Sequence, residues 1–542
     1  MPPSPLVSFA DACRALTLAE RAEALRAGGL EGAAPDSSRP DPVARWRFDQ
    51  WRALSPFRSD ERFSRRLALQ GLDADQFASL LATPASVAGA ALTDRPCWMR
   101  WMSALEPGGL GRVAGEHDID PALAAKVPQA AGGGPDLDPF LAPVRPWIDQ
   151  ARARLGHGLV RLAAASGAEP LFAAAETGAL LAANLPARLV PVLARTLVLE
   201  LQVARHQGLL SGESAAARFT FFIARLGQHD VAAALLGEYP VLAREVLREL
   251  AQWVDGSLEL LACLAADAPR LIERFFHGRH PGLLSALDGG AGDRHRGGRS
   301  VRVLTFAGGS RLVYKPRPLA VERHFQQLLA WLGDSGDGAP RTVAVLDRGD
   351  YGWMEFVAAQ GCSGPDEVVS FYRRLGGLLA VLYVLEATDC HFENLIAAGG
   401  QPVLVDLETL FQPRIAPPQV AEPDKRLAGQ LFSDSVLRIG LLPFLVGAGG
   451  DFEGVDLSGI AAVAGRPSPR PVMTMAGAGT DEMHVVRERL PLPGGSNVPF
   501  LGGREGESRQ EMEAAEHTEE LAEGFTAVYR RLAERRAELL AP

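Results

Sequence analysis

The first half of the chain is dominated by apolar residues at intervals of three and four, with charged residues between them. This spacing places apolar side chains on one face of an α-helix, so it predicts helices throughout residues 1 to about 285. The clearest cases are Leu16–Ala27, Phe63–Leu81, Phe140–Ala165, Leu185–His206 and Tyr239–Leu261. A Pro-rich stretch at 31–42 and a Gly-rich stretch at 130–136 predict loops between helices.

At Asp288 the pattern changes to short strand-like runs that alternate with single helices. We expect strands at Val301–Phe306, Arg311–Tyr314, Thr342–Leu346, Trp353–Val357 and Pro402–Val405, and helices at Ala320–Leu332, Asp366–Glu386 and 512–540. This order predicts an α+β protein. A largely helical region, 1–285, precedes a two-lobed, nucleotide-binding domain, 286–542.

Composition narrows the class of protein further. Apolar residues make up 47% and charged residues 22%, which indicates a globular chain, and a net charge of −10 argues against general nucleic-acid binding. The five cysteines are scattered and form no metal-binding spacing, so neither a disulfide scaffold nor a cysteine-rich zinc site is expected. No secretory signal is visible, and the longest apolar run, near Leu378–Leu385, is too short to cross a bilayer. We therefore expect a cytoplasmic protein without a transmembrane segment.

Lys315 is the first candidate for chemistry. Only three of the 55 basic residues are lysines, and Lys315 stands at the end of a predicted strand in the run LVYKPR. Lysine is a compact point charge, whereas arginine is a wide planar fork, so a lysine in an arginine-rich chain suggests a specific role. Contact with nucleotide phosphates is the functional interpretation, and an edge lysine that reaches solvent is the alternative.

A second group of candidates follows the long helix. Asp389, His391 and Asn394 form the pattern D-x-H-x-x-N, and Asp406 follows the next strand in the turn DLE. Asp389 or His391 could orient or deprotonate a hydroxyl group, while Asn394 and Asp406 offer the hard oxygen ligands that Mg²⁺ prefers. Protein kinases have an HRD loop and end in DFG, so this order looks more like a lipid-kinase site.

Two further segments complete the candidate site. The strand WMEFV lies where a kinase hinge would be, so backbone groups near Glu355 and Val357 are candidates for reading an adenine edge. An ordinary buried strand explains WMEFV equally well. In the glycine-rich segment, GDRH places Asp293 and His295 upstream of Lys315. Glycines let backbone N–H groups approach phosphate closely, although such a segment alone is often a solvated loop.

Taken in order, these motifs resemble the dehydratase half of class II lanthipeptide synthetases, the LanM type. The resemblance covers nearly the whole chain and is carried by LVLELQVARHQGLLSGESAAARFTFFI, GDRH, LVYKPRPLAVERHFQQLLAWL, EATDCHFENLIAAGGQPVLVDLETLF, GTDEM and SNVPFLGG. It implies a lipid-kinase-like two-lobed domain elaborated with helices. It also implies an enzyme that uses ATP and Mg²⁺ to phosphorylate Ser and Thr of a precursor peptide. Phosphate is then eliminated to give dehydroalanine or dehydrobutyrine.

The same resemblance implies a role for each candidate residue. Lys315 would bind the nucleotide phosphates, Asp389 and His391 would act on the substrate hydroxyl, and Asn394 and Asp406 would hold Mg²⁺. Asp293, His295, Glu408 and Thr480 match further active-site positions of the family. The helical region would help to recognise the leader of the precursor.

The chain departs from the family pattern in two places. Six residues before Thr480 the family has an arginine, which it uses in elimination, and this chain has Thr474. The nearest upstream arginine is Arg470. The chain also lacks the cyclase half with its Cys/His-bound zinc, so no ring formation is expected and a separate cyclase is a candidate partner. A kinase that stops at the phosphopeptide and a non-catalytic precursor-binding module are therefore the two alternative functions.

Overall fold

The computed structural model describes residues 5–27, 42–105, 137–165, 170–289, 294, 296–333, 340–413, 423–502 and 510–540. The chain forms two compact units. The first comprises residues 1–266 with 475–485, and the second comprises 267–474 with 486–542. The sequence-based boundary was placed at 285. The structure instead divides between residues 266 and 267, within one long helix, and the hairpin segment 475–485 belongs to the first unit.

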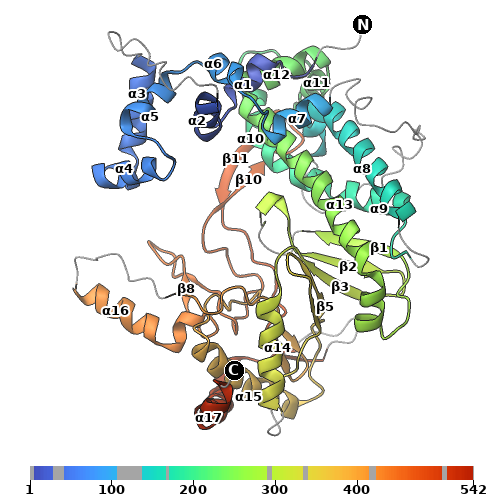
Figure 1. Cartoon of the computed structure of the whole chain (residues 1–542), viewed down its shortest axis with the longest axis vertical. Coiled ribbons are helices and arrows are strands. Elements are labelled where there is room, and N and C mark those ends of the chain that lie inside the picture. Colours follow the sequence, from blue (N-terminus) through green and yellow to red (C-terminus); the bar gives the residue numbers. More distant parts are fainter. Residues whose placement is uncertain are drawn as a thin grey trace. The chain divides into compact units, whose positions relative to one another are not determined.

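The first unit is helical (Figure 1). Its helices are α1 (Phe9–Arg14), α2 (Leu18–Ala27), α3 (Pro42–Ala53), α4 (Asp60–Ala68), α5 (Ala74–Ala82), α6 (Ala85–Ala90), α7 (Cys97–Ala104), α8 (Arg145–Ala165), α9 (Ala174–Ala183), α10 (Leu185–His206), α11 (Ala215–Leu226), α12 (His229–Glu238) and α13 (Pro240–Phe276), which runs on into the second unit.

Helix α10 begins and ends where its sequence pattern predicts. Leucines recur every four residues from Leu185 to Leu201, and each is almost completely buried, which explains the helix through its apolar face. Together α9 and α10 form the one stretch in the described ranges that is long and apolar enough to cross a membrane. Because this leucine row is used in the core of the unit, the stretch gives no clear transmembrane segment.

The single helix expected at Phe63–Leu81 is wrong, since α4 and α5 replace it. Gly71 adopts a left-handed conformation (φ 67°), and the Leu72 N–H donates to the Leu67 carbonyl, which together close the end of α4. Asp73 then starts α5 through a reciprocal capping box with Gln76. The apolar period continues across the break, which is why the pattern alone did not show it.

The second unit contains a five-stranded antiparallel sheet in the order β1-β2-β3-β5-β4. Its strands are β1 (Leu284–Gly289), β2 (Arg302–Phe306), β3 (Arg311–Lys315), β4 (Val345–Asp347) and β5 (Gly352–Glu355), with α14 (Ala320–Gly333) between β3 and β4. Strand β1 was not predicted, because the sequence analysis extended helix to 285. Gly278 and Gly282 both have positive φ and end the helical path before it.

A mainly helical half follows the sheet. It holds α15 (Pro365–Val384), the hairpin β6 (Leu395–Ala398) and β7 (Gln401–Leu404), α16 (Pro423–Asp434), α17 (Thr518–Glu534) and α18 (Arg536–Leu539). Short pairs β8 (Leu445–Val446) with β9 (Val455–Asp456) and β12 (Phe500–Leu501) with β13 (Gln510–Glu511) fill the remainder. A further pair, β10 (Val472–Ala476) with β11 (His484–Glu488), leaves the second unit after Thr474 and returns to it at Val486. Strand β6 was missed, and the closing helix starts at Thr518 rather than at 512.

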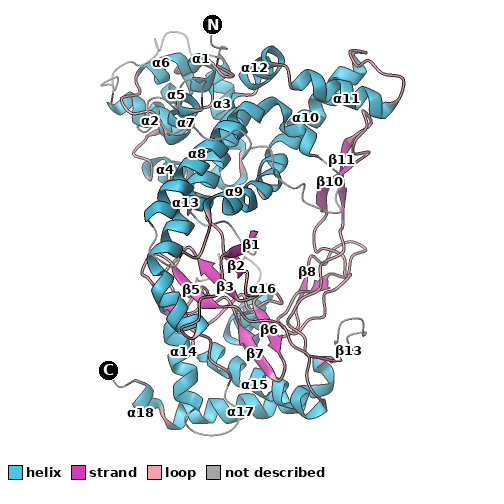
Figure 2. Cartoon of the chain, turned by 90° about the vertical axis from the view of Figure 1, so that its right-hand side faces the viewer, coloured by secondary structure: helices cyan, strands magenta, loops and turns pink. Residues whose placement is uncertain are grey.

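Helix α15 is the centre of this half, and Figure 2 shows α17 lying against it. The helices can approach closely because glycines stand at the crossing. A Cβ on Gly376 would lie 1.9 Å from the Leu521 carbonyl oxygen, and one on Gly524 would lie 1.8 Å from that of Arg373. The fixed helix pair supports the loop after α15 and the β6–β7 hairpin, which carry the candidate site.

Candidate functional site

A cavity of about 500 Å³ in the second unit brings most of the predicted site residues together. The sheet contributes Val301, Val303, Val313, Lys315, Met354, Glu355, Phe356 and Val357, and the segment after α15 contributes Asp389, His391, Glu393, Asn394, Ile396, Val405, Asp406 and Glu408. Eight predicted residues therefore line one space. The residues from the sheet and its flanks are mostly apolar, and four of the eight from the segment after α15 are acidic.

Lys315 ends β3 and is almost completely buried, with 4% of its side chain exposed. Its Nζ donates to the Val405 carbonyl oxygen at 2.6 Å and lies 3.6 Å from both Glu322 Oε1 and Asp406 Oδ1. Burial lowers the pKa of Lys315, and the two carboxylates partly oppose that effect. The buried position and the two anionic partners do not fit a lysine that reaches solvent.

Glu322 and Arg317 complete a charge network that the sequence analysis missed. Glu322, on α14, is fully buried, and its Oε1 lies 2.7 Å from Arg317 Nη2. The same Arg317 nitrogen donates to Asp406 Oδ1 at 2.5 Å, and Arg317 Nε lies 3.4 Å from Glu408 Oε2. Two cations thus hold three carboxylates. A signal was present, because Glu322 shares the buried face of α14 with Phe325, Leu329 and Leu332.

Asp406 is held in its ionised form by this network. Burial alone would raise its pKa, but Lys315 and Arg317 outweigh burial, and the pKa falls below its ordinary value. A backbone N–H from Glu408 also favours the charged form. Glu408 itself is about half exposed at the rim of the cavity. The turn DLE therefore presents a carboxylate that is ionised at neutral pH beside a more open one.

The loop after α15 has an unusual backbone. Asp389 is a non-glycine residue with φ 61°, a conformation that costs energy and often marks a functional site. Asn394 Nδ2 donates to the Asp389 carbonyl oxygen at 2.8 Å, which stabilises this turn. Because the Asn394 amide nitrogen is used in this way, its amide oxygen is the group left for a cation.

His391 stands between two acidic side chains. Its Nε2 is 3.8 Å from Asp389 Oδ1, and its Nδ1 is 3.8 Å from Glu393 Oε2. The Glu393 backbone N–H donates to His391 Nδ1 at 3.3 Å, so in the neutral ring the proton sits on Nε2 and faces Asp389. The intervening Cys390 is buried, which raises the pKa of its thiol to about 12 and argues against a nucleophilic role.

Glu355 and Val357, which the sequence analysis named as candidates for reading an adenine edge, both line the cavity. The Glu355 N–H donates to the Ala344 carbonyl oxygen, and the Glu355 carboxylate pairs with Arg341. The Glu355 N–H is therefore already used within the protein.

Three predicted residues are not among those that line this cavity. Asp293 and His295 are outside the described residues. Thr480 belongs to the first unit, where it occupies the turn between β10 and β11. Its Oγ1 donates to the Gly477 carbonyl oxygen at 2.7 Å. Thr474, at the position of the family arginine, donates to Glu488 Oε1 at 2.6 Å.

The residue after Thr480 fixes the turn to the helices of the first unit. Asp481 is fully buried, and Arg218 binds it through two hydrogen bonds of 2.6 and 3.1 Å. The hydrogen bond from Arg218 is the main cause that lowers the pKa of Asp481, and burial opposes it. Gln202 Nε2 also donates to the Asp481 and Met483 carbonyl oxygens.

The fold and the charged cavity define an α+β protein with a lysine–glutamate pair facing an acidic loop. Residues 239–542 match a family model described as a domain of unknown function, DUF4135, and the chain belongs to this family. A relative from Lactococcus lactis subsp. lactis, the lacticin 481/lactococcin biosynthesis protein LcnDR2, is 26% identical over 264 residues. The match covers 47% of this chain and 28% of the relative. The expected relationship to the class II lanthipeptide synthetases is therefore confirmed.

Proposed function

We propose that this protein dehydrates Ser and Thr of a ribosomal precursor peptide in lanthipeptide biosynthesis, through ATP-dependent phosphorylation followed by phosphate elimination. The observation that carries the proposal is that Lys315 and Asp406, which form one charge network with Glu322, line the same cavity as Asp389 and Asn394. A two-lobed, lipid-kinase-like arrangement of the catalytic domain is part of the same proposal.

The residues present fit ATP and Mg²⁺. Phosphate groups require a fixed cation, which buried Lys315 supplies, while Mg²⁺ requires hard oxygens such as the Asp406 carboxylate and the Asn394 amide oxygen. Mg²⁺ commonly takes one or two protein ligands and completes its shell with phosphate oxygens and water. Bound Mg²⁺–ATP would supply the transferable phosphoryl group and neutralise its charge. The apolar wall, including Val303, Val313 and Met354, suits a nucleobase.

In the phosphorylation step, Asp389 would accept the proton of the substrate hydroxyl. The hydroxyl oxygen then forms a bond to the γ-phosphorus, and the bond between that phosphorus and the bridging oxygen breaks to release ADP. His391 would orient Asp389, because its neutral ring presents an N–H rather than a lone pair to that carboxylate. Lys315 would hold the phosphates in line.

Elimination needs a base for the α-proton and cations for the departing phosphate. As the α-proton leaves, a carbon–carbon double bond forms and the bond between the β-carbon and the phosphate oxygen breaks. Arg317, which pairs with Glu408, would be a cation for this role. Because Thr474 stands where the family has arginine, a peptide Ser/Thr kinase without the elimination step is the second candidate function.

Variants of the network test the proposal. Lys315→Ala and Asp406→Ala should each abolish transfer of labelled phosphate from ATP to a Ser/Thr-containing precursor, because each removes a charge that acts on the nucleotide or its cation. Arg323→Ala removes a positive charge at an exposed position of α14 that does not line the cavity, and is the control. Unchanged phosphate transfer in Lys315→Ala would contradict the assignment of the cavity.

A further inference from the structure

Two adjoining hollows lie among the first helices of the first unit. One, of about 330 Å³, is lined by Leu16, Leu18, Arg21, Trp46, Arg47, Gln50, Trp51 and Leu81. The other, of about 360 Å³, is lined by Thr17, Leu18, Ala19, Trp51, Phe57, Phe63, Arg66, Leu67, Gln70 and Phe77. Leu18 and Trp51 line both, so the two hollows form one surface, which we call the aromatic–arginine groove.

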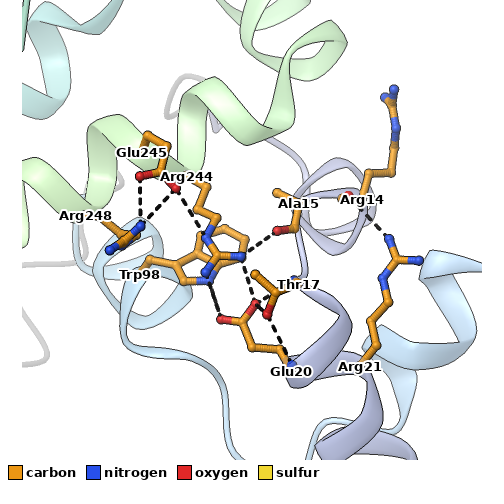
Figure 3. Close-up of polar contacts among 9 residues, drawn as sticks. All are labelled: Arg14, Ala15, Thr17, Glu20, Arg21, Trp98, Arg244, Glu245 and Arg248. Atoms are coloured by element: carbon orange, nitrogen blue, oxygen red, sulfur yellow. Dashed lines mark hydrogen bonds and ion pairs between the residues drawn. The ribbon is translucent and has the colours of Figure 1, made fainter. Parts of the chain in front are cut away.

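Hydrogen bonds between α2 and its neighbours hold one side of the groove in place. Glu20, on α2, accepts hydrogen bonds from the Thr17 N–H, from Arg244 Nη1 at 2.8 Å and from Trp98 Nε1 at 3.3 Å (Figure 3). Arg244, on α13, also donates to the Ala15 carbonyl oxygen. These contacts fix the start of α2 on α13 and thereby place the next residue, Arg21, at the groove.

Arg21 and Arg47 give the groove a positive charge that the described residues leave uncompensated. Neither side chain forms an ion pair with a carboxylate among those residues. The Arg21 Nε is buried without a hydrogen-bond partner there, and only its Nη2 donates weakly, at 3.4 Å, to the Arg14 carbonyl oxygen (Figure 3). Burial lowers the pKa of Arg21, and the nearby Arg47 guanidinium lowers it further. An anion between the two guanidinium groups would relieve this repulsion.

The surrounding segment has the same sign of charge. Residues 42–70 contain seven arginines against three acidic residues, in a chain whose net charge is −10. Large apolar side chains accompany them: Trp46 is 61% exposed and Trp51 is 38% exposed. A positive, aromatic surface on an acidic protein fits a short partner that carries both carboxylates and large apolar side chains.

We propose that the aromatic–arginine groove binds an acidic, apolar-containing segment of the precursor peptide. A carboxylate of the peptide is held between Arg21 and Arg47, and its apolar side chains enter the hollows on either side of Trp51. A nucleic acid fits less well, because the negative charge of the whole chain repels a long polyanion. The identity of the partner as precursor rests on the proposed function, whereas the chemistry of the groove does not.

A binding measurement on the full chain tests the groove. The probe is a fluorescein-labelled peptide of glutamate and leucine, and fluorescence anisotropy reports its binding. Arg21→Gln/Arg47→Gln should weaken binding roughly tenfold or more, since two charge-assisted contacts are lost. Trp46→Ala, at an exposed position, should weaken it severalfold. Arg45→Gln/Arg62→Gln removes the same charge from exposed positions that line neither hollow, and should leave binding nearly unchanged.

Three results would overturn the proposal. The control variant could lose as much affinity as the test variant, which would mean general attraction of charge. The glutamine version of the peptide could bind equally well, which would remove the role of the carboxylate. A single-stranded oligonucleotide could bind more tightly and displace the peptide, which would make this a nucleic-acid site. Phosphorylation is a separate readout: a wild-type chain that binds the peptide through Arg21 and Arg47 but phosphorylates no precursor would refute only the proposed function.

Discussion

Glu322 decides whether the two cations of the site are held in place. Its carboxylate is fully buried beside Lys315 and Arg317, and a buried charge is tolerated only when it is paired. Glu322→Gln should lower the free energy of unfolding by about 3 kcal/mol, because Lys315 and Arg317 are left short of negative charge. Urea denaturation measures this. Arg323→Gln, at the neighbouring exposed position on α14, is the control, and an equal effect of both changes would refute the role of Glu322.

The ionised Asp406 also makes the stability of the protein depend on pH. The pKa of Asp406 lies below its ordinary value of 3.8 in the folded protein, so its contribution to stability is fully present above that value. The contribution is lost as the pH falls through the lower, folded pKa. The difference in urea midpoint between the wild type and Asp406→Asn should therefore shrink on acidification from neutral pH to about pH 3. A difference that stays constant over this range would contradict the ionised Asp406.

The sequence alone identified some of the residues of the site. Lys315 could be predicted because lysine is rare in the chain, and Asp389, Asn394 and Asp406 because hard oxygens recur after predicted elements. Arg317 could not be singled out, because all but three of the 55 basic residues are arginines. Glu322 could have been found as the one carboxylate on the apolar face of its helix.

At the scale of elements, the crossing of α15 and α17 is the most sharply defined contact. Gly376→Ala should destabilise the protein by about 3 kcal/mol, because the new Cβ would overlap the Leu521 carbonyl oxygen and force the helices apart. Gly256→Ala, inside α13, meets no atom within 4 Å and should be neutral or slightly stabilising through helix propensity. Equal midpoints in thermal unfolding for the two variants would contradict the close packing.

Elements with a long apolar period could be predicted well, and short or interrupted elements could not. Helix α10 matches its pattern because five leucines at four-residue spacing are all buried. The break between α4 and α5 was missed because a single glycine and a capping box interrupt a pattern that otherwise continues. Strand β1 was missed because the predicted helix was extended to 285, and β6 because it is a four-residue run that directly follows the acidic loop.

The whole molecule separates the predicted catalytic residues between its two units. Thr480 lies in the first unit, in a turn fixed by Asp481 and Arg218, whereas Lys315 and Asp406 lie in the second. Thr480→Ala should leave phosphorylation intact and slow elimination, because we propose that its hydroxyl acts in the second step only. Comparing phosphopeptide with dehydrated peptide over time measures this. An equal fall in both rates would show that Thr480 only stabilises its turn.

Mass spectrometry of a cognate Ser/Thr-containing precursor, incubated with this protein, ATP and Mg²⁺, tests the central claim most directly. We expect the mass of the precursor to fall by successive losses of water, with a phosphorylated intermediate that appears first. With Lys315→Ala the precursor should stay unmodified. Phosphate additions that never convert to water losses would contradict the dehydratase and leave a peptide kinase. An unmodified precursor with the wild-type protein would contradict both.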